Sequence, residues 1–193
     1  MFDELLEACR RNDLERVRSL VTADPTLLNR HAATGETALL AALYHRSRET
    51  VDWLRSREWN RTVFEAAAID DATHLGALLD GNPEATDSYS EDGWTPLHLA
   101  AFFGAGDAAR LLLAHGADPR RIARNAMANT PLHAALAAKQ LTLVRLLLAA
   151  GADPRVECGG YTPLAIAEGG GFDAGAELVR AALTEGARAG GRS

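Results

Sequence analysis

Apolar residues recur in the same order along successive stretches of this chain. In each stretch an alanine lies five positions after a threonine, and a leucine or valine lies seventeen positions after it. The threonines are Thr37, Thr62, Thr95, Thr130 and Thr162; the alanines are Ala42, Ala67, Ala100, Ala135 and Ala167; the last set is Leu54, Leu79, Leu112, Leu147 and Val179. Asp3, Ala8 and Leu20 occupy the same places near the N-terminus. This periodicity predicts six similar units, each with a short helix followed by a second helix.

The residues of one such stretch indicate where the helices of a unit would begin and end. Thr95 can cap the first helix through its hydroxyl, and Pro96 fits the first helical position, where no N–H is needed. Gly104 suits a left-handed helix end. The second helix is expected at about Asp107–His115, with Leu111 and Leu112 buried, and Gly116 ends it. The small alanines of the first helix would let neighbouring units approach closely.

A tetrad marks the start of the last three full stretches. Thr-Pro-Leu-His occurs at Thr95–His98 and Thr130–His133, and Thr-Pro-Leu-Ala occurs at Thr162–Ala165. The copies are 35 and 32 residues apart, and a Gly-Ala-Asp triplet follows each of the first two starts by 21 residues. This pattern resembles the ankyrin repeat. Asp24-Pro25-Thr26-Leu27-Leu28-Asn29 also resembles a phrase of bacterial ankyrin proteins.

The resemblance covers about residues 4–183 and implies an all-α solenoid of stacked helix pairs with short β-hairpin-like loops. We expect one array over 1–183, followed by a flexible tail at 184–193. Its six units are 1–30 (N-terminal cap), 31–60 (a shortened repeat), 61–90, 91–123, 124–156 and 157–183 (C-terminal cap).

The second unit is unusually short. Thr37 and Thr62 are only 25 residues apart, about eight fewer than the usual period of 33. Arg55–Asn60 stands where a hairpin is expected, so we predict a tight junction there. Trp59 is expected to fill the space of the missing hairpin, and Trp53 is expected in the core.

Composition and charge exclude several classes of function. The chain has 193 residues, a net charge of −6 and an acidic middle, with eight acids and one arginine in residues 61–95, which argues against nucleic-acid binding. Cys9 and Cys158 lie in distant units, so no disulfide is expected. The sequence shows neither a signal peptide nor a membrane span, which favours the cytoplasm. Nineteen arginines against one lysine favour a GC-rich coding sequence, such as a bacterial one.

Catalytic chemistry finds little support in the sequence. In the resembling family the tetrad histidine, here His98 and His133, forms hydrogen bonds within and between repeats. The other histidines have no partner at metal-ligand spacing. Gly169-Gly170-Gly171 lacks the lysine and the preceding strand of a phosphate-binding loop, and Asp70-Asp71 is typical of a solvated turn. We therefore expect no cofactor, no metal and no enzymatic activity.

The resemblance also implies a binding surface. Partners of ankyrin arrays commonly bind a concave groove, to which each unit contributes the residue before its threonine and the residues seven and eight positions after it. These places hold five of the eleven aromatic residues of the chain, and clustered exposed aromatics are typical of binding hot spots. The predicted partner-binding residues are Trp94, Phe102, Phe103, Tyr44, Tyr161 and Asn129, joined by Met127 from the loop before Thr130.

A purely stabilising role stays open for three of these aromatics. Phe102 or Phe103 could pack against the neighbouring hairpin, and Trp94 could cover its own turn. The nearby acids Glu84, Asp87, Glu91 and Asp92 could steer a basic partner or serve solubility alone.

We thus expect a monomeric protein-interaction module that binds a partner protein but neither nucleic acid nor membrane. Two other classes remain. A small-ligand or enzymatic site in the groove would need a deep pocket with convergent polar groups. A self-associating scaffold would use the same aromatics, and its mass in solution would depend on concentration.

Overall fold

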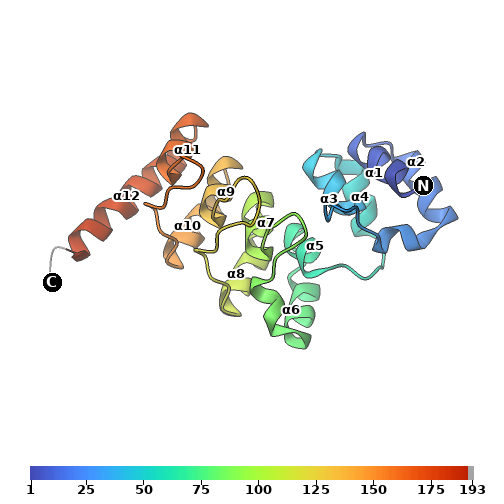
Figure 1. Ribbon diagram of the computed structural model, residues 1–193, viewed down its shortest axis with the longest axis horizontal. Coiled ribbons are helices and arrows are strands. Elements are labelled where there is room, and N and C mark those ends of the chain that lie inside the picture. The colour runs from blue at the N-terminus through green and yellow to red at the C-terminus, as the bar shows by residue number, and fades with distance from the viewer. Residues whose placement is uncertain (191–193) are drawn as a thin grey trace.

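Successive helix pairs make up the chain. The computed structural model describes residues 1–190, and Figure 1 shows the pairs lined up from the N-terminal helices at one end to α12 at the other. The helices are α1 (Phe2–Arg10), α2 (Leu14–Ala23), α3 (Ala38–Tyr44), α4 (Arg48–Arg55), α5 (Val63–Ala68), α6 (Ala72–Gly81), α7 (Pro96–Phe103), α8 (Gly106–Ala114), α9 (Pro131–Ala137), α10 (Leu141–Ala149), α11 (Pro163–Gly169) and α12 (Asp173–Gly190). The 3-10 turns η1 (Pro25–Asn29) and η2 (Pro83–Asp87) follow α2 and α6. This stack confirms the predicted all-α fold class, and we number its six helix pairs as units one to six.

The expected threonine caps begin the first helix of units two to six. Thr95 adopts an extended backbone and accepts a hydrogen bond from the N–H of His98, while Pro96 occupies the first turn of α7. The caps satisfy N–H groups that have no partner within the helix. The loops before them are hairpin-like, with isolated β-bridges at His31–Thr37 and Cys158–Tyr161.

One residue with a left-handed backbone joins the two helices of each unit. These residues are Asn12, Arg46, Asp70, Gly104, Lys139 and Gly171. Two of them also link neighbouring units, because Asn12 Oδ1 accepts from Thr50 N at 3.1 Å and Asp70 Oδ1 accepts from Ala108 N at 2.7 Å. An arginine side chain carries no acceptor, so Arg46 cannot link unit two to unit three in this way.

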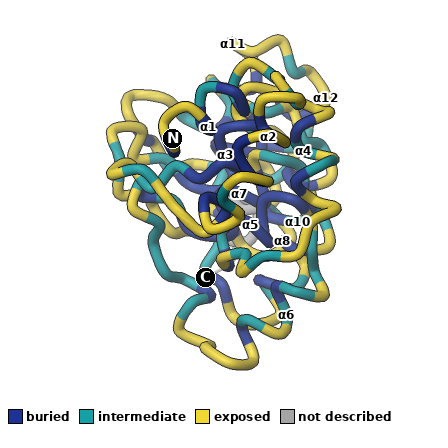
Figure 2. Tube along the Cα trace, turned by 90° about the vertical axis from the view of Figure 1, so that its right-hand side faces the viewer, coloured by how far each residue is buried: buried dark blue, intermediate teal, exposed yellow. Residues whose placement is uncertain are grey.

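The buried side chains form two large cores rather than one. Units one and two, together with Ile69 of unit three, bury the first core, which includes Leu5 and Leu39. Units three to six bury the second core, which includes Leu112 and Leu132. A small cluster of Leu40, Ala68 and Leu99 connects them, with one residue from each of α3, α5 and α7. Figure 2 shows the buried positions running through the middle of the stack and the exposed ones at loops and helix ends. The interruption coincides with the shortened second unit.

Arg61 holds the shortened junction together. Its guanidinium donates to the carbonyls of Arg55 and Arg57 at 2.8 and 2.7 Å, pairs with Asp71 at 3.0 Å and lies 4.5 Å from the centre of the Trp59 ring. Trp59 is half-buried against the first core, in the place where a filling role was predicted. A single side chain therefore replaces the hydrogen bonds that a hairpin would make.

Trp53 departs from the expected core position. It is only half-buried against the first core, and the guanidinium of Arg57 lies 4.5 Å from the centre of its ring. The arginine covers the face of the indole that would otherwise contact water.

The missing hairpin lets the loops before units two and four meet. His31 Nδ1 lies 3.2 Å from a carboxylate oxygen of Glu91. A side chain at Gly35 would place its Cβ 2.8 Å from Glu91 Cβ, and Gly35 has a φ of +79°. Units that are not neighbours in sequence order therefore contact each other on this side of the stack.

The C-terminal end is helical as far as the structure describes it. Helix α12 continues to Gly190, and Thr184 Oγ1 donates to the Arg180 carbonyl at 2.9 Å. Alanine, glutamate and arginine have good helix propensity, which offsets the glycine at position 186. The last three residues, 191–193, lie outside the described residues.

Candidate functional site

Three aromatic rings from units two and four form one cluster. The ring centres of Tyr44 and Phe103 are 5.3 Å apart, those of Tyr44 and Phe102 are 6.3 Å apart, and those of Phe102 and Phe103 are 5.1 Å apart in an edge-on arrangement. All three lie at the C-terminal ends of α3 and α7. These distances are typical of favourable aromatic pairs. The structure thus brings together three of the predicted site residues, which we call the aromatic cluster.

The predicted site residues in this region differ in how much they pack against the core. Phe103 and Trp94 are half-buried against Leu40, Ala68 and Leu99, the residues that connect the two cores. The Trp94 ring also lies 5.4 Å from the His98 ring. For these two side chains a stabilising role therefore accompanies any role in binding.

Three other side chains remain open to solvent. Tyr44 and Phe102 are each 38% exposed, and Met127 is 62% exposed. They come from three different units but border one hollow of the surface. Apolar side chains exposed together in this way are candidates for contact with another molecule.

A mostly apolar cavity lies between the aromatic cluster and the loop of Met127. We call it the groove cavity. Its volume is about 250 Å³, and its lining residues are Tyr44, Trp94, His98, Leu99, Phe102, Met127, Asn129, Ala134 and Ala137. The alanines of α9 leave this space open because they carry no larger side chain. Five of the seven predicted partner-binding residues line one space.

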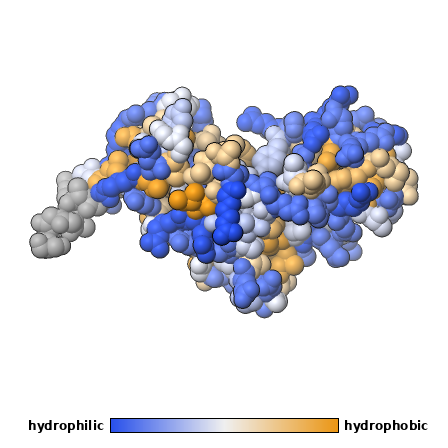
Figure 3. Space-filling view, in the orientation of Figure 1, coloured by the Kyte–Doolittle hydropathy of each residue, from blue (hydrophilic) through white to orange (hydrophobic). Residues whose placement is uncertain are grey.

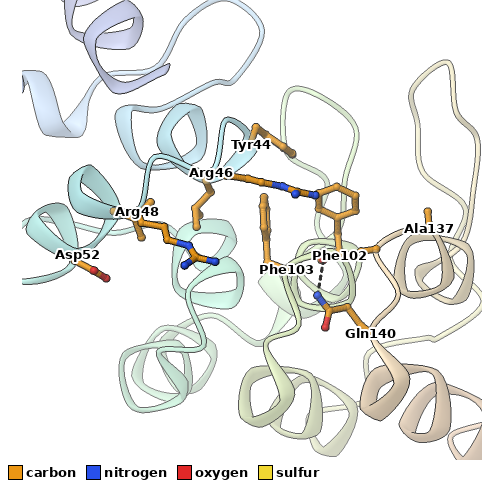
Figure 4. Close-up of a pocket in the computed structure, with 11 residues that line it drawn as sticks. Tyr44, Arg46, Arg48, Asp52, Phe102, Phe103, Ala137 and Gln140 are labelled. Carbon is orange, nitrogen blue, oxygen red and sulfur yellow. Dashed lines mark hydrogen bonds between the residues drawn. The ribbon is translucent and has the colours of Figure 1, made fainter. Parts of the chain in front are cut away.

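A second, larger cavity lies at the turn between α3 and α4, and we call it the turn cavity. Its volume is about 650 Å³, and it shares Tyr44, Phe102 and Ala137 with the groove cavity. Arg46, Arg48 and Asp52 add charged groups to its wall. Figure 4 shows the Arg46 side chain extending toward Phe102 at the end of α7. Gln140 donates to the Phe102 carbonyl at 3.5 Å. In Figure 3 the surface is hollowed between the part that carries α3 and α4 and the part that carries α9 and α11.

Tyr161 lies apart from the other predicted site residues. It is 62% exposed on the hairpin before unit six and lines neither cavity. Its carbonyl accepts from His133 Nε2 at 3.2 Å.

The tetrad histidines join units together. His98 Nδ1 lies 2.8 Å from Thr95 Oγ1, and His98 Nε2 lies 3.0 Å from the carbonyl of Asn129. His133 makes the same contacts with Thr130 and Tyr161. Burial lowers the pKa of His98 to about 4 and lowers the pKa of His133 in the same direction. A neutral imidazole that donates through Nε2 to the next unit explains both contacts.

Electrostatic potential differs between the two sides of the site. Burial raises the pKa of Tyr44, and the carboxylates of Asp92 and Glu36 raise it further. Both acids belong to the hairpin side, whereas Arg46 and Arg48 stand on the turn side. Glu36 is paired with Arg10, so Asp92 supplies the negative charge of the hairpin side and the two arginines supply the positive charge of the turn side.

The site is lined by aromatic rings, small apolar side chains and a few charged groups. No group of three or more metal-ligating side chains occurs in the part of the chain that the structure describes. Burial raises the pKa of Cys9 to about 12, which leaves its thiol protonated and unreactive at neutral pH. His98 is occupied by the bonds between units. The lining residues can thus exclude water, stack and pair with charges.

Sequence reasoning missed Arg46 and Arg48. The rule that selects the groove residues takes only one place before each threonine and two after it, and both arginines fall outside. The sequence feature that could have revealed them is the short spacing between Thr37 and Thr62, because it brings the turn between α3 and α4 toward unit four.

Comparison with known proteins agrees with this architecture. A family model described as ankyrin repeats (3 copies) matches residues 5–158. The chain belongs to the ankyrin-repeat family. Ankyrin repeats are generally protein-interaction modules, and the ankyrin-repeat domain is typically non-catalytic.

Two curated relatives share part of this ankyrin-repeat chain. The mouse 2-5A-dependent ribonuclease is 37% identical over 68 residues, which cover 35% of this chain and 9% of the relative. The human 2-5A-dependent ribonuclease is 39% identical over 62 residues, which cover 32% of this chain and 8% of the relative. The similarity thus spans less than a tenth of either ribonuclease. No helix in the described portion of the ankyrin-repeat chain has the length and apolar character to cross a membrane.

Part of the acidic stretch is engaged within the ankyrin stack. Asp87 accepts from the N–H of Asp118 at 3.2 Å and pairs with Arg121 at 3.3 Å. Glu91 lies against His31. These contacts tie neighbouring loops together, which reduces the charge that this stretch could offer to a basic partner.

Proposed function

We propose that this ankyrin-repeat chain binds a partner protein over the aromatic cluster and the groove cavity. The observation that carries this proposal is the exposure of Tyr44, Phe102 and Met127 around one apolar cavity. None of the three is needed to fill a core. Anchors of this kind contribute most of the binding free energy in many protein interfaces.

The size of the groove cavity favours a side chain as its occupant. Its volume of about 250 Å³ is below the roughly 300–1,000 Å³ of small-ligand sites, whereas the adjoining turn cavity of about 650 Å³ lies within that range. One or two apolar side chains of a partner would fill the groove cavity. They would displace water from Phe102 and Met127 without needing any further polar contact.

Affinity capture with matched variants tests the proposal. Phe102→Ala/Met127→Ala removes two exposed anchors and should leave the free energy of unfolding within about 1 kcal/mol of the wild type. Ile122→Ala is the control, because Ile122 is 48% exposed and lines neither cavity. We expect a protein that is retained by the wild type and by Ile122→Ala and is lost by the double variant.

Other outcomes would contradict the proposal. Capture that the double variant leaves unchanged would place the interface elsewhere on the stack. A mass in solution that rises with concentration in the wild type, but not in the double variant, would instead make these aromatics a self-association surface.

A further inference from the structure

The turn cavity carries a basic wall that no contact within the chain explains. Among the described residues, neither Arg46 nor Arg48 forms a salt bridge or a side-chain hydrogen bond, and both are exposed. Asp52 is the one carboxylate that lines the cavity with them.

Arg46 also stands at a position where units one and three use residues that link them to the next unit. Asn12 and Asp70 occupy the same left-handed position and accept hydrogen bonds from the next unit. Arg46 accepts none, and a left-handed backbone is less favourable for arginine than for asparagine, aspartate or glycine. An arginine at this position therefore does not stabilise the fold, but its guanidinium group could pair with a bound anion.

We propose that the turn cavity receives a carboxylate-bearing segment of the partner protein. Aspartate or glutamate side chains of the segment pair with Arg46 and Arg48, and an apolar side chain of the same segment enters the groove cavity. The inference rests on the proposed function, since it names the chemistry of the partner at that site. The two cavities share Tyr44, Phe102 and Ala137, so a single segment can occupy both.

The charged residues on the two sides of the site determine the orientation in which the partner segment binds. Its carboxylates face the α3–α4 turn, because Arg46 and Arg48 line the cavity there, whereas the hairpin side carries the carboxylate of Asp92. Guanidinium groups suit carboxylates because they donate two parallel hydrogen bonds. The proximity of apolar walls strengthens such pairs relative to fully solvated ones.

Selection from a library of randomised peptides tests this inference with a defined probe. We expect peptides enriched by the wild type to combine Asp or Glu with an aromatic or aliphatic residue. The same library should lose the acidic preference on Arg46→Gln/Arg48→Gln and keep the apolar one. Arg145→Gln is the charge control, because Arg145 is exposed on α10, away from both cavities.

The affinity of one selected peptide then gives the size of the effect. Arg46→Gln/Arg48→Gln should weaken its binding by at least about tenfold, and Arg145→Gln should change it by less than about twofold at moderate salt. Replacing the acids of the peptide by amides should cause the same loss in the wild type and no further loss in the double variant.

Three results would overturn the inference. Selected peptides that are apolar but not acidic would refute the pairing of a carboxylate with the arginines, but would still agree with the proposed function. No peptide selected by either chain would count against both. Displacement of a selected peptide by a single-stranded oligonucleotide at micromolar concentration would assign the arginines to phosphate instead.

Discussion

At the scale of single residues, the polar side chains of the interior determine how the units join. His98 is the clearest case, because one ring bonds its own threonine cap and the carbonyl of the next unit. Glu65 takes the same place in unit three, where it completes the cap of Thr62. Its Oε1 is buried and accepts no hydrogen bond among the described residues.

The tetrad histidines should make stability depend on pH. The pKa of His98 is lowered from 6.5 to about 4, so the unfolded state takes up the proton more readily than the folded state. The stabilising contribution is present in full above pH 6.5 and is lost as the pH falls toward 4, on the order of 3 kcal/mol for this residue. Denaturant titrations should show a weaker pH dependence for His98→Gln than for the wild type in this range. Equal pH dependence in both, or an effect as large from the exposed His45→Gln, would contradict this role.

Glu65→His should stabilise the chain. The imidazole would keep the bond to Thr62 and could donate to the next unit, as His98 and His133 do. We expect a gain of about 1 kcal/mol in the free energy of unfolding, measured from urea titrations. Glu65→Ala, which removes the cap contact, should lower it. A Glu65→His variant less stable than the wild type would show that unit three cannot form the bond.

At the scale of elements, the junction between α4 and α5 sets the shape of the site. A spacing of 25 residues leaves no room for a hairpin, and Arg61 replaces it with bonds to the end of α4. The loops before units two and four then meet, and Tyr44 reaches the rings of α7. The aromatic cluster therefore depends on this short spacing.

Arg61→Ala should therefore loosen both the junction and the cluster. It removes two bonds to carbonyls at the end of α4, the ion pair with Asp71 and the contact with Trp59. We expect a loss of about 2 kcal/mol in the free energy of unfolding, together with changed near-ultraviolet circular dichroism. Arg57→Ala, which removes only a contact with Trp53, should cost much less. Similar losses from both variants would refute the role of Arg61 as the junction residue.

Sequence alone predicts the repeating features well, because each depends on local chemistry. Threonine caps, the first-turn prolines and the end of α7 at Gly104 all follow from backbone preferences of single residues. The cavities depend on how units two and four meet across unit three. Phe103 is half-buried and Phe102 is exposed, and this difference likewise depends on Leu40 and Ala68, which lie far from them in sequence.

At the scale of the whole molecule, two cores are connected through few side chains. Repeat stacks unfold according to the strength of the contacts between neighbouring units, and the weakest such contact here lies between units two and three. Leu40, Ala68 and Leu99 connect the cores, Ile69 of unit three reaches into the first core, and Phe103 of the aromatic cluster packs against the connecting residues. Binding at the cluster should therefore also couple the two parts.

Leu99→Ala should separate the unfolding of these parts. Leu99 is 2% exposed and belongs to the connecting cluster, so its truncation should cost about 2–5 kcal/mol. With Trp94 replaced by phenylalanine in both variants, Trp53 and Trp59 report on the first core by fluorescence, whereas circular dichroism reports on all helices. The two transitions should diverge in Leu99→Ala more than in Leu132→Ala, which lies within the second core. Coincident transitions in both variants would argue for a single cooperative stack.

Hydrogen exchange of the bound chain tests the binding surface most directly. With a captured partner or a selected peptide bound, amides at the C-terminal ends of α3 and α7 and in the loop of Met127 should exchange more slowly. The outer helices α6, α8 and α10 should be unchanged. Slower exchange confined to those outer helices, with none around Phe102, would contradict the groove as the binding site.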